Sequence, residues 1–231
     1  MSGAQAKQAD AGMTNRPILY AHPFASYCQK VLIALYENDT PFTLRMLDDA
    51  DGFAELARLW PHKLFPVLVD GDATLIESSI IVEHLAQHRP GAVRLVPDDA
   101  RAALRTRFMD RFFDNYVMNP MQKVVGDSLR APEQRDAFGV TEARQRLDVS
   151  YRWLDSTLQD CLWATGDDFS LADCAAAPSL FYADWVHEID RQFAHVRAYR
   201  ARLLARPSVA RVVDEARPYR KLFPLGAPDR D

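Results

Sequence analysis

Apolar positions along the first ninety residues follow two periods, which predicts strands alternating with helices. Short β-rich runs over 18–20, 40–47, 65–69 and 74–76 are expected to be strands, and an Asp-Gly turn joins the last two as a hairpin. Apolar residues three and four positions apart predict helices over 28–35, 52–60 and 78–88. This βαβαββα order is typical of an α/β domain in which helices cover a four-stranded sheet.

The pattern changes after Arg89-Pro90-Gly91, where strand signals become rare. Helical spacing extends over 98–115, 132–157, 171–186 and 193–205, and the proline-rich segment from Arg217 is expected to be irregular. The predicted fold class is therefore α/β plus all-α. We expect a disordered tail at 1–15, an α/β domain at 16–91 and an all-helical domain at 92–231.

The composition of the chain indicates which kinds of partner the protein binds. The chain has 231 residues, a net charge of −4 and no apolar run near the roughly 18 residues of a membrane span, so neither nucleic acid nor a membrane is an expected partner. Its three cysteines lack the C-x-x-C pairing of a zinc site, and their odd number does not suit a disulfide framework. We expect no metal, a reducing compartment and a small-molecule partner.

Two segments carry residue types suited to binding a peptide-like ligand. Pro66 opens a strand, and a cis bond before it would turn the main-chain groups of Phe65 outward to pair with a bound backbone. Glu77-Ser78 begins a helix, whose free N–H groups and Ser78 hydroxyl suit a carboxylate, while Glu77 suits an ammonium group. The alternatives are a structural proline and ordinary helix capping.

A third segment, Phe169-Ser170-Leu171-Ala172-Asp173, has the spacing of a capping box. We expect Ser170 and Asp173 to fix the start of a buried helix. Its predicted role is purely structural.

In this order and spacing, the three segments resemble the glutathione transferase superfamily. The resemblance implies a thioredoxin-like first domain with a cis-proline, a helical second domain, and glutathione as the co-substrate of a cytoplasmic, homodimeric detoxification enzyme. It implies that Phe65 and Pro66 hold the cysteinyl part of glutathione and that Glu77 and Ser78 hold the γ-glutamyl end. Lys63 or His62 would reach the glycyl carboxylate.

The sequence departs from the family at the position of the residue that activates the glutathione thiol: where most members have serine or cysteine, this chain has Ala25. Ser26 follows it at a helix start, where a hydroxyl and the helix dipole would both stabilise a thiolate. Ser26 could instead cap the helix in an S-x-x-Q box with Gln29. Tyr20 and Cys28 are the alternative catalytic residues, although a strand-end tyrosine and a cysteine on an apolar stripe are usually packed in the core.

The second substrate is expected between the domains. The candidate pocket residues, which could equally form an ordinary core between helices, are Phe24, Arg107, Arg111, Phe112, Asn115, Tyr116 and Met118. The leading hypothesis is conjugation of glutathione to a small hydrophobic electrophile. The alternatives are glutathione-dependent reduction or isomerisation, and a non-catalytic binding module.

Overall fold

The computed structural model describes residues 16–231, so the predicted tail at 1–15 lies outside the described residues. The first seven elements are β1 (Ile18–Ala21), α2 (Ser26–Glu37), β2 (Thr43–Met46), α3 (Ala50–Leu59), β3 (Val67–Asp70), β4 (Ala73–Ile76) and α4 (Ser78–His88). The strands form one sheet in the order β2-β1-β3-β4, in which only the β1–β2 pair is parallel. The predicted βαβαββα order and the hairpin are confirmed.

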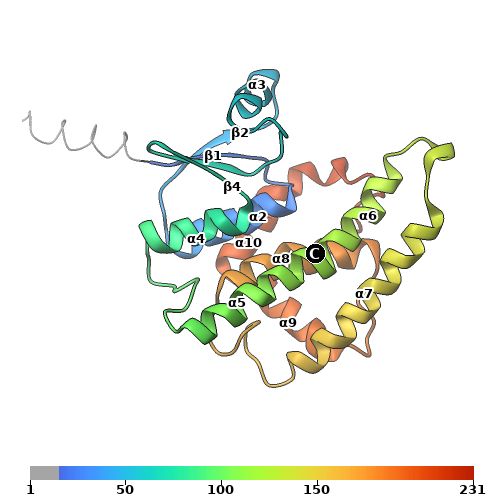
Figure 1. Ribbon diagram of the computed structural model, residues 1–231. Coiled ribbons are helices and arrows are strands. Elements are labelled where there is room, and N and C mark those ends of the chain that lie inside the picture. Colours follow the sequence, from blue (N-terminus) through green and yellow to red (C-terminus); the bar gives the residue numbers. More distant parts are fainter. Residues whose placement is uncertain (1–15) are drawn as a thin grey trace, which may run out of the picture.

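The two faces of the sheet meet different partners. Leu19 and Leu68 point into the large core shared with α2, α4 and the helical domain. Tyr20 and Val67 point the other way, into a small core under α3 that includes Leu56. Figure 1 shows α3 alone on the outer side of the sheet and α2 and α4 on the side facing the helical domain. The alternation of side chains along β1 thus decides which residues can approach the interface between the domains.

The second part of the chain is all-helical, as predicted. Its elements are α5 (Ala100–Phe112), a π-helical turn η1 (Phe113–Met118), α6 (Asn119–Ser128), a 3₁₀ turn η2 (Pro132–Gln134), α7 (Ala137–Thr157), α8 (Leu171–Val186), α9 (Ala194–Ala205), α10 (Pro207–Ala216) and a 3₁₀ turn η3 (Arg217–Leu222). None of the helices in residues 16–231 has the length and apolarity needed to cross a membrane.

Two helices, α6 and α10, are absent from the sequence-based prediction. Helix α10 begins at Pro207, because proline is compatible with the first position of a helix although it usually marks the end of one. Helix α6 continues directly from η1, so no cap marks its start, and Gly126 weakens its helical signal. The expected irregular segment from Arg217 begins as the 3₁₀ turn η3, and that expectation was wrong for residues 217–222.

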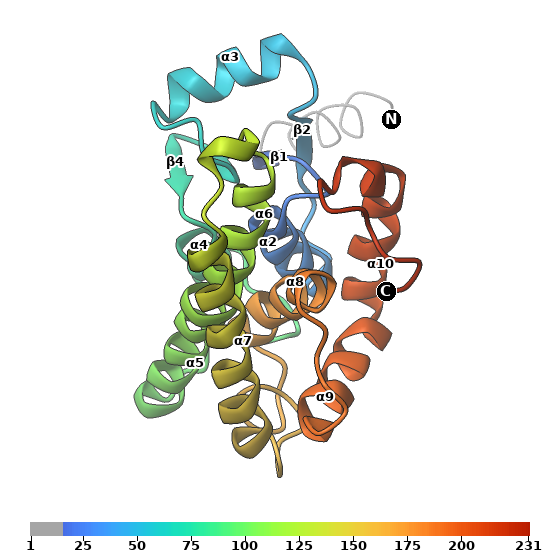
Figure 2. The ribbon, with the colours of Figure 1, turned by 90° about the vertical axis from the view of Figure 1, so that its right-hand side faces the viewer.

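Helix α8 lies at the centre of the helical domain, between α5–α7 and α9–α10 (Figure 2). The carboxylate of Asp173, in its first turn, accepts bonds from the N–H of Ser170 at 2.8 Å, the N–H of Ala164 at 2.8 Å and the hydroxyl of Tyr199 at 2.6 Å. Burial nevertheless raises the pKa of Asp173 above its ordinary value. The predicted capping box is confirmed, and it ties three segments of the domain together.

Candidate functional site

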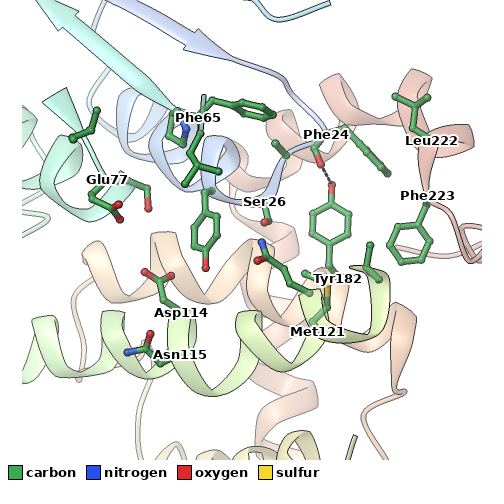
Figure 3. A pocket seen from close by; sticks show the side chains of 18 of the residues that line it. Phe24, Ser26, Phe65, Glu77, Asp114, Asn115, Met121, Tyr182, Leu222 and Phe223 are labelled. Carbon is green, nitrogen blue, oxygen red and sulfur yellow. Dashed lines mark hydrogen bonds between the residues drawn. The ribbon is translucent and has the colours of Figure 1, made fainter. Parts of the chain in front are cut away.

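A cavity of about 650 Å³ lies where the first domain meets the helical domain. Figure 3 shows its polar and apolar ends on either side of Ser26. The first domain contributes Phe24, Ala25, Ser26, Tyr27, Trp60, Leu64, Phe65, Pro66, Ile76, Glu77 and Ser78. The other lining residues are Arg111, Asp114, Asn115, Met121, Gln122, Val125, Leu129, Tyr182, Leu222, Phe223 and Pro224.

Ser26 lies in the wall of the cavity as the first residue of α2. The alternative role of Ser26, an S-x-x-Q capping box with Gln29, is not formed: Ala25 is the N-cap residue, and its carbonyl accepts the N–H of Gln29 at 3.0 Å. The side chain of Gln29 turns instead to the carbonyl of Pro23 and the hydroxyl of Tyr182, to which it donates at 2.9 and 3.0 Å. Within residues 16–231 the Ser26 hydroxyl has no hydrogen-bond partner, so it can donate to a ligand in the cavity.

The alternative catalytic residues lie elsewhere. Tyr20 is on the α3 side of the sheet and does not line the cavity, and burial together with Glu55 raises the pKa of its phenol. Cys28 is fully buried in the core, and burial raises the pKa of its thiol to about 12. A thiol with that pKa is a poor nucleophile near neutral pH.

Glu77 and Ser78 lie at the polar end, at the start of α4. Glu77 is the N-cap residue, but its carboxylate makes no capping bond and points toward the cavity (Figure 3). Its backbone has φ +68°, a left-handed conformation that costs a non-glycine residue about 1–3 kcal/mol and is found mainly at functional sites. Ser78 is buried beside it and lines the same cavity. Ordinary capping therefore does not explain Glu77.

Phe65 and Pro66 form the neighbouring wall. The peptide bond between them is cis, and both residues precede the paired part of β3, which begins at Val67. Both residues line the cavity and lie outside the ladder of the sheet. Lys63 is exposed and lies outside the cavity lining, where Leu64 takes its place, so the structure does not bring Lys63 to the site.

A group of charges, buried except for the half-exposed Arg111, adjoins the polar end. The ammonium of Lys30 on α2 lies 2.5 Å from Asp110, 2.9 Å from Asp114 and 2.8 Å from the hydroxyl of Ser79. Arg111 pairs with both aspartates at 2.8 and 2.7 Å and also contacts Ser79. Two cations and two anions thus join the domains next to Ser79, and both Arg111 and Asp114 also line the cavity.

Tyr27 stands between the polar end and α6. Its hydroxyl donates to the side-chain oxygen of Asn119 at 3.4 Å, and burial, with a smaller effect from Asp114, raises its pKa to about 12. The phenol therefore stays protonated near neutral pH. Tyr27 can serve as a hydrogen-bond donor or as a wall of the cavity, but not as a base.

The apolar end draws its side chains from distant elements, and most were missed by sequence reasoning. Tyr182 on α8 donates its hydroxyl to the carbonyl of Phe24 at 2.9 Å, and the two rings meet edge to face at 5.6 Å. Met121 and Val125 come from α6, and Leu222, Phe223 and Pro224 from the segment after α10. Figure 3 shows Phe24, Tyr182, Leu222 and Phe223 grouped on one side of Ser26.

Only part of the predicted second-substrate pocket lies in the cavity. Phe24, Arg111 and Asn115 line it. Arg107 instead forms a bidentate pair with Glu83, Met118 is buried in the core, and Tyr116 points outward and is 56% exposed. A π-helix has an extra residue in each turn, so η1 shifts the faces that an α-helical pattern assigns to residues 113–118.

Among residues 16–231, no cluster of three or more His, Cys, Asp or Glu side chains has the arrangement of a metal site. The chemistry offered by the lining residues is hydrogen bonding by a free hydroxyl, recognition of charge by Glu77 and Asp114, and apolar contact.

Comparison with known proteins identifies the family. Residues 19–92 match the model of the glutathione S-transferase N-terminal domain, and residues 117–207 match that of the C-terminal domain. Human glutathione S-transferase theta-1 is 30% identical over 182 residues, covering 71% of this chain and 72% of that protein. Glutathione S-transferase GstB of Escherichia coli K12 is 28% identical over 192 residues, covering 80% of this chain and 91% of that protein.

A solved structure agrees with both fold and family. The glutathione S-transferase of Methylobacterium radiotolerans, in complex with glutathione sulfonate, superposes with a TM-score of 0.74 at 26% identity. The alignment covers 86% of this chain and 94% of that one. The chain therefore belongs to the glutathione S-transferase family, with a thioredoxin-like N-terminal domain and an all-helical C-terminal domain.

Proposed function

We propose that this protein conjugates glutathione to small, uncharged, hydrophobic electrophiles, with the hydroxyl of Ser26 activating the thiol. The observation that carries the proposal is the position of Ser26, a free hydroxyl at a helix N-terminus between a polar and an apolar half-cavity. Family membership and the binding of glutathione by relatives support the choice of co-substrate.

In this proposal glutathione lies along the polar end. Its γ-glutamyl ammonium group pairs with Glu77, and its γ-glutamyl carboxylate takes the hydroxyl of Ser78 and the free N–H groups at the start of α4. The backbone groups of Phe65, which lie outside the ladder of β3, pair with the cysteinyl unit. The cysteinyl sulfur then lies beside Ser26 and faces the apolar end.

The chemical step is nucleophilic attack by sulfur. The thiol loses its proton to solvent, and the Ser26 hydroxyl donates a hydrogen bond to the resulting thiolate. The thiolate forms a new sulfur–carbon bond with the electrophile, whose leaving group or π-system accepts the displaced electron pair. A hydrogen bond to a charged group contributes about 1.5–3 kcal/mol and the start of α2 about 0.3–1 kcal/mol, which together lower a thiol pKa of about 8.5 by roughly 1–3 units.

The electrophile is proposed to be uncharged because the apolar end offers no ionic partner. The charged lining residues are Glu77, Arg111 and Asp114, and all three belong to the polar end. Arg111 is already paired with Asp110 and Asp114. Burying an unpaired charge of a substrate against Phe24 and Phe223 would be costly.

The decisive experiment measures the pKa of bound glutathione from the ultraviolet absorbance of its thiolate. In the Ser26→Ala variant we expect this pKa to rise by about 1–2 units and the turnover of chlorodinitrobenzene to fall about 10–100-fold. The affinity for S-methylglutathione, which has no ionisable thiol, should stay within about twofold of wild type. Ser26→Thr, which keeps the hydroxyl, should restore most of the activity. Tyr20→Phe is the matched control, because Tyr20 lies outside the cavity and its variant should behave as wild type.

Three results would contradict the proposal, each in a different part. An unchanged thiol pKa in Ser26→Ala would remove Ser26 from the mechanism. Binding of glutathione without any lowering of its pKa in the wild type would favour a non-catalytic binding module, the alternative that Ala25 at the usual activating position keeps open. Activity only in disulfide reduction or in isomerisation would favour the remaining enzymatic alternative, and a Cys28 thiol mechanism is opposed by the burial of that residue.

We also propose that the protein is a homodimer working in the cytoplasm, with roughly residues 16–91 and 92–231 as its two domains. Exposed apolar side chains on α5 and α7 support self-association: Leu104 is 68% exposed, Phe108 is 51% exposed, and Phe108 packs edge to face against Trp153. Light scattering after size-exclusion chromatography should give twice the mass of the chain. Phe108→Glu is expected to shift that mass to the monomer, and a monomeric wild type would contradict the proposal.

A further inference from the structure

The loop that leads to Ser26 is held by the side chain of its own first residue. Residues 22–25 connect β1 to α2, and Nδ1 of His22 accepts the N–H of Phe24 at 3.2 Å. The carbonyl of His22 accepts the N–H of Ala25 at 3.0 Å. A side chain that accepts the N–H two residues further on forms an Asx-type turn, which Asn or Asp usually makes. His22 therefore makes with a titratable ring a turn that Asn makes without one.

The other main-chain groups of this loop are paired as well. The side chain of Gln29 donates to the carbonyl of Pro23 at 2.9 Å, and its N–H donates to the carbonyl of Ala25. The hydroxyl of Tyr182 donates to the carbonyl of Phe24 at 2.9 Å, the bond drawn as a dashed line in Figure 3. Every N–H and C=O from residue 23 to residue 25 thus has a partner. The path of the loop into α2 depends on those partners.

Among the three side chains that hold the loop, His22 is the one whose charge changes near neutral pH. Gln29 does not ionise, and burial raises the pKa of the Tyr182 phenol above its ordinary value. An imidazole titrates between about pH 5 and pH 8, and once protonated it has an N–H on both ring nitrogens. Nδ1 of a protonated His22 would face the N–H of Phe24 as a second donor. Protonation therefore removes the bond that fixes the turn.

Groups from three neighbouring elements face His22. Asp48, in the loop after β2, favours the charged imidazole. Tyr219 of η3 meets the ring edge to face at 4.7 Å. The thiol of Cys28 on α2 contacts the main chain of His22, and burial raises the pKa of that thiol to about 12. The burial of His22 outweighs the effect of Asp48 and lowers the pKa of the imidazole below its ordinary value of 6.5, so the ring is neutral at neutral pH.

We propose that His22 is a positioning residue: its neutral imidazole fixes Phe24 and Ser26 for the ligand, and its protonation in mild acid releases them. This inference rests on the proposed function for the identity of the ligand. It goes beyond that function in assigning a pH-dependent control of the site to a residue that does not line the cavity. The loop loosens as the pH falls below 6.5, because the fold favours the neutral ring and the unfolded chain does not.

The first test locates the proton on the ring by nitrogen-15 NMR of the imidazole side chains. At about pH 7 we expect His22 to be neutral, with its proton on Nε2 and with Nδ1 free to accept the N–H of Phe24. The chain has six histidines, and the signals of His22 are those that disappear in His22→Asn. A proton on Nδ1, or a charged ring, would overturn the proposal.

The second test measures the affinity for S-hexylglutathione by calorimetry. This derivative has no ionisable thiol, and its hexyl chain extends into the apolar end, which Phe24 lines. Between about pH 7.5 and about pH 5 we expect the wild-type affinity to fall about 3–10-fold, the equivalent of one lost hydrogen bond.

His22→Asn keeps an acceptor for the N–H of Phe24 but does not titrate, so its affinity should change less than about twofold over the same range. His22→Ala should bind weakly at both values. The matched control is His195→Asn, which alters an exposed histidine of α9 and should behave as wild type. A pH dependence in His22→Asn equal to that of wild type would overturn the proposal.

The two proposals fail in distinguishable ways. If the wild-type protein bound no S-hexylglutathione at either pH, the proposed function would fall, and the role of His22 would be judged without a ligand. The measurement is then hydrogen exchange at the Phe24 amide, whose protection at neutral pH should fall about 3–10-fold in His22→Ala and stay at the wild-type level in His22→Asn. Equal protection in all three proteins would overturn the positioning role by itself.

Discussion

The two ends of the cavity are built in different ways. At the polar end, Phe65, Pro66, Glu77 and Ser78 come from two short segments of one domain, each fixed by the strand or helix it adjoins. The apolar end takes Phe24, Met121, Tyr182 and Phe223 from elements far apart in the chain. The difference teaches that polar recognition here depends on local backbone geometry, whereas the shape of the apolar end depends on how the helices pack.

The largest expected effect concerns the charges that join the domains behind the polar end. Replacing Lys30 by Met leaves Asp110 and Asp114 buried with only Arg111 to pair with, and we expect the free energy of unfolding to fall by about 3–5 kcal/mol. Urea unfolding followed by circular dichroism measures it. Lys123→Met removes a half-exposed pair with Asp136 and serves as the control, with a loss of less than about 1 kcal/mol expected. Equal losses in the two variants would show that the buried cluster does not hold the interface.

Next in size is the loss of glutathione affinity in Glu77→Gln. Removing the charge weakens the pairing with the ligand's ammonium group, and we expect the affinity to fall about 10–100-fold. Calorimetry should show the same fold-change for S-methyl- and S-hexylglutathione, since both share the polar end. Glu83→Gln is the control, because Glu83 lies on the same helix and pairs with Arg107 outside the cavity. A loss confined to the S-hexyl derivative would break the division into two ends.

A smaller effect is expected at Tyr182, whose hydroxyl links α8 to the loop before Ser26. Tyr182→Phe removes the bonds to Phe24 and Gln29 and should cost about 1 kcal/mol of unfolding free energy. The KM for chlorodinitrobenzene should rise, while the affinity for glutathione stays the same. Tyr151→Phe loses a bond to His187 away from the cavity and should match the stability loss without the change in KM. A fall in glutathione affinity in Tyr182→Phe would show that the two ends are coupled.

The smallest effect lies outside both ends, where α4 is tied to β3. Arg89, with a further contribution from His84, lowers the pKa of Asp70 to about 2 from its ordinary value of 3.8. Because the folded-state pKa is depressed, the stabilisation is complete above pH 3.8 and is lost as the pH falls toward 2. Asp70→Asn should therefore have a lower free energy of unfolding than wild type at neutral pH, by less than about 1 kcal/mol. Urea unfolding at a series of pH values should show this difference shrinking in acid. A difference independent of pH would contradict the ion-pair explanation.

The sequence predicted most of the first domain and of the polar end. The Asp-Gly turn of the hairpin is a local signal, and it is confirmed: Gly71 lies at the turn with φ +60°. Glu77-Ser78 and Phe65-Pro66 were recognised for the same reason: each lies where an element begins, and a short motif reports that position. Helix α6 and the segment after α10 give no such signal, because a continued helix has no cap and an irregular segment has no hydrophobic period.

The sequence by itself determined the order of the elements in the first domain and the capping box at Ser170 and Asp173, and it supplied the residues that we propose hold the polar half of glutathione. Only the tertiary structure decided that Ser26 is free while Ala25 caps α2, that η1 turns Tyr116 and Met118 away from the cavity, and that Phe223 closes its far end. The physical reason is the separation along the chain over which each kind of interaction acts. Backbone preferences and caps act over about four residues, whereas the faces that meet across two domains depend on the packing of the whole chain.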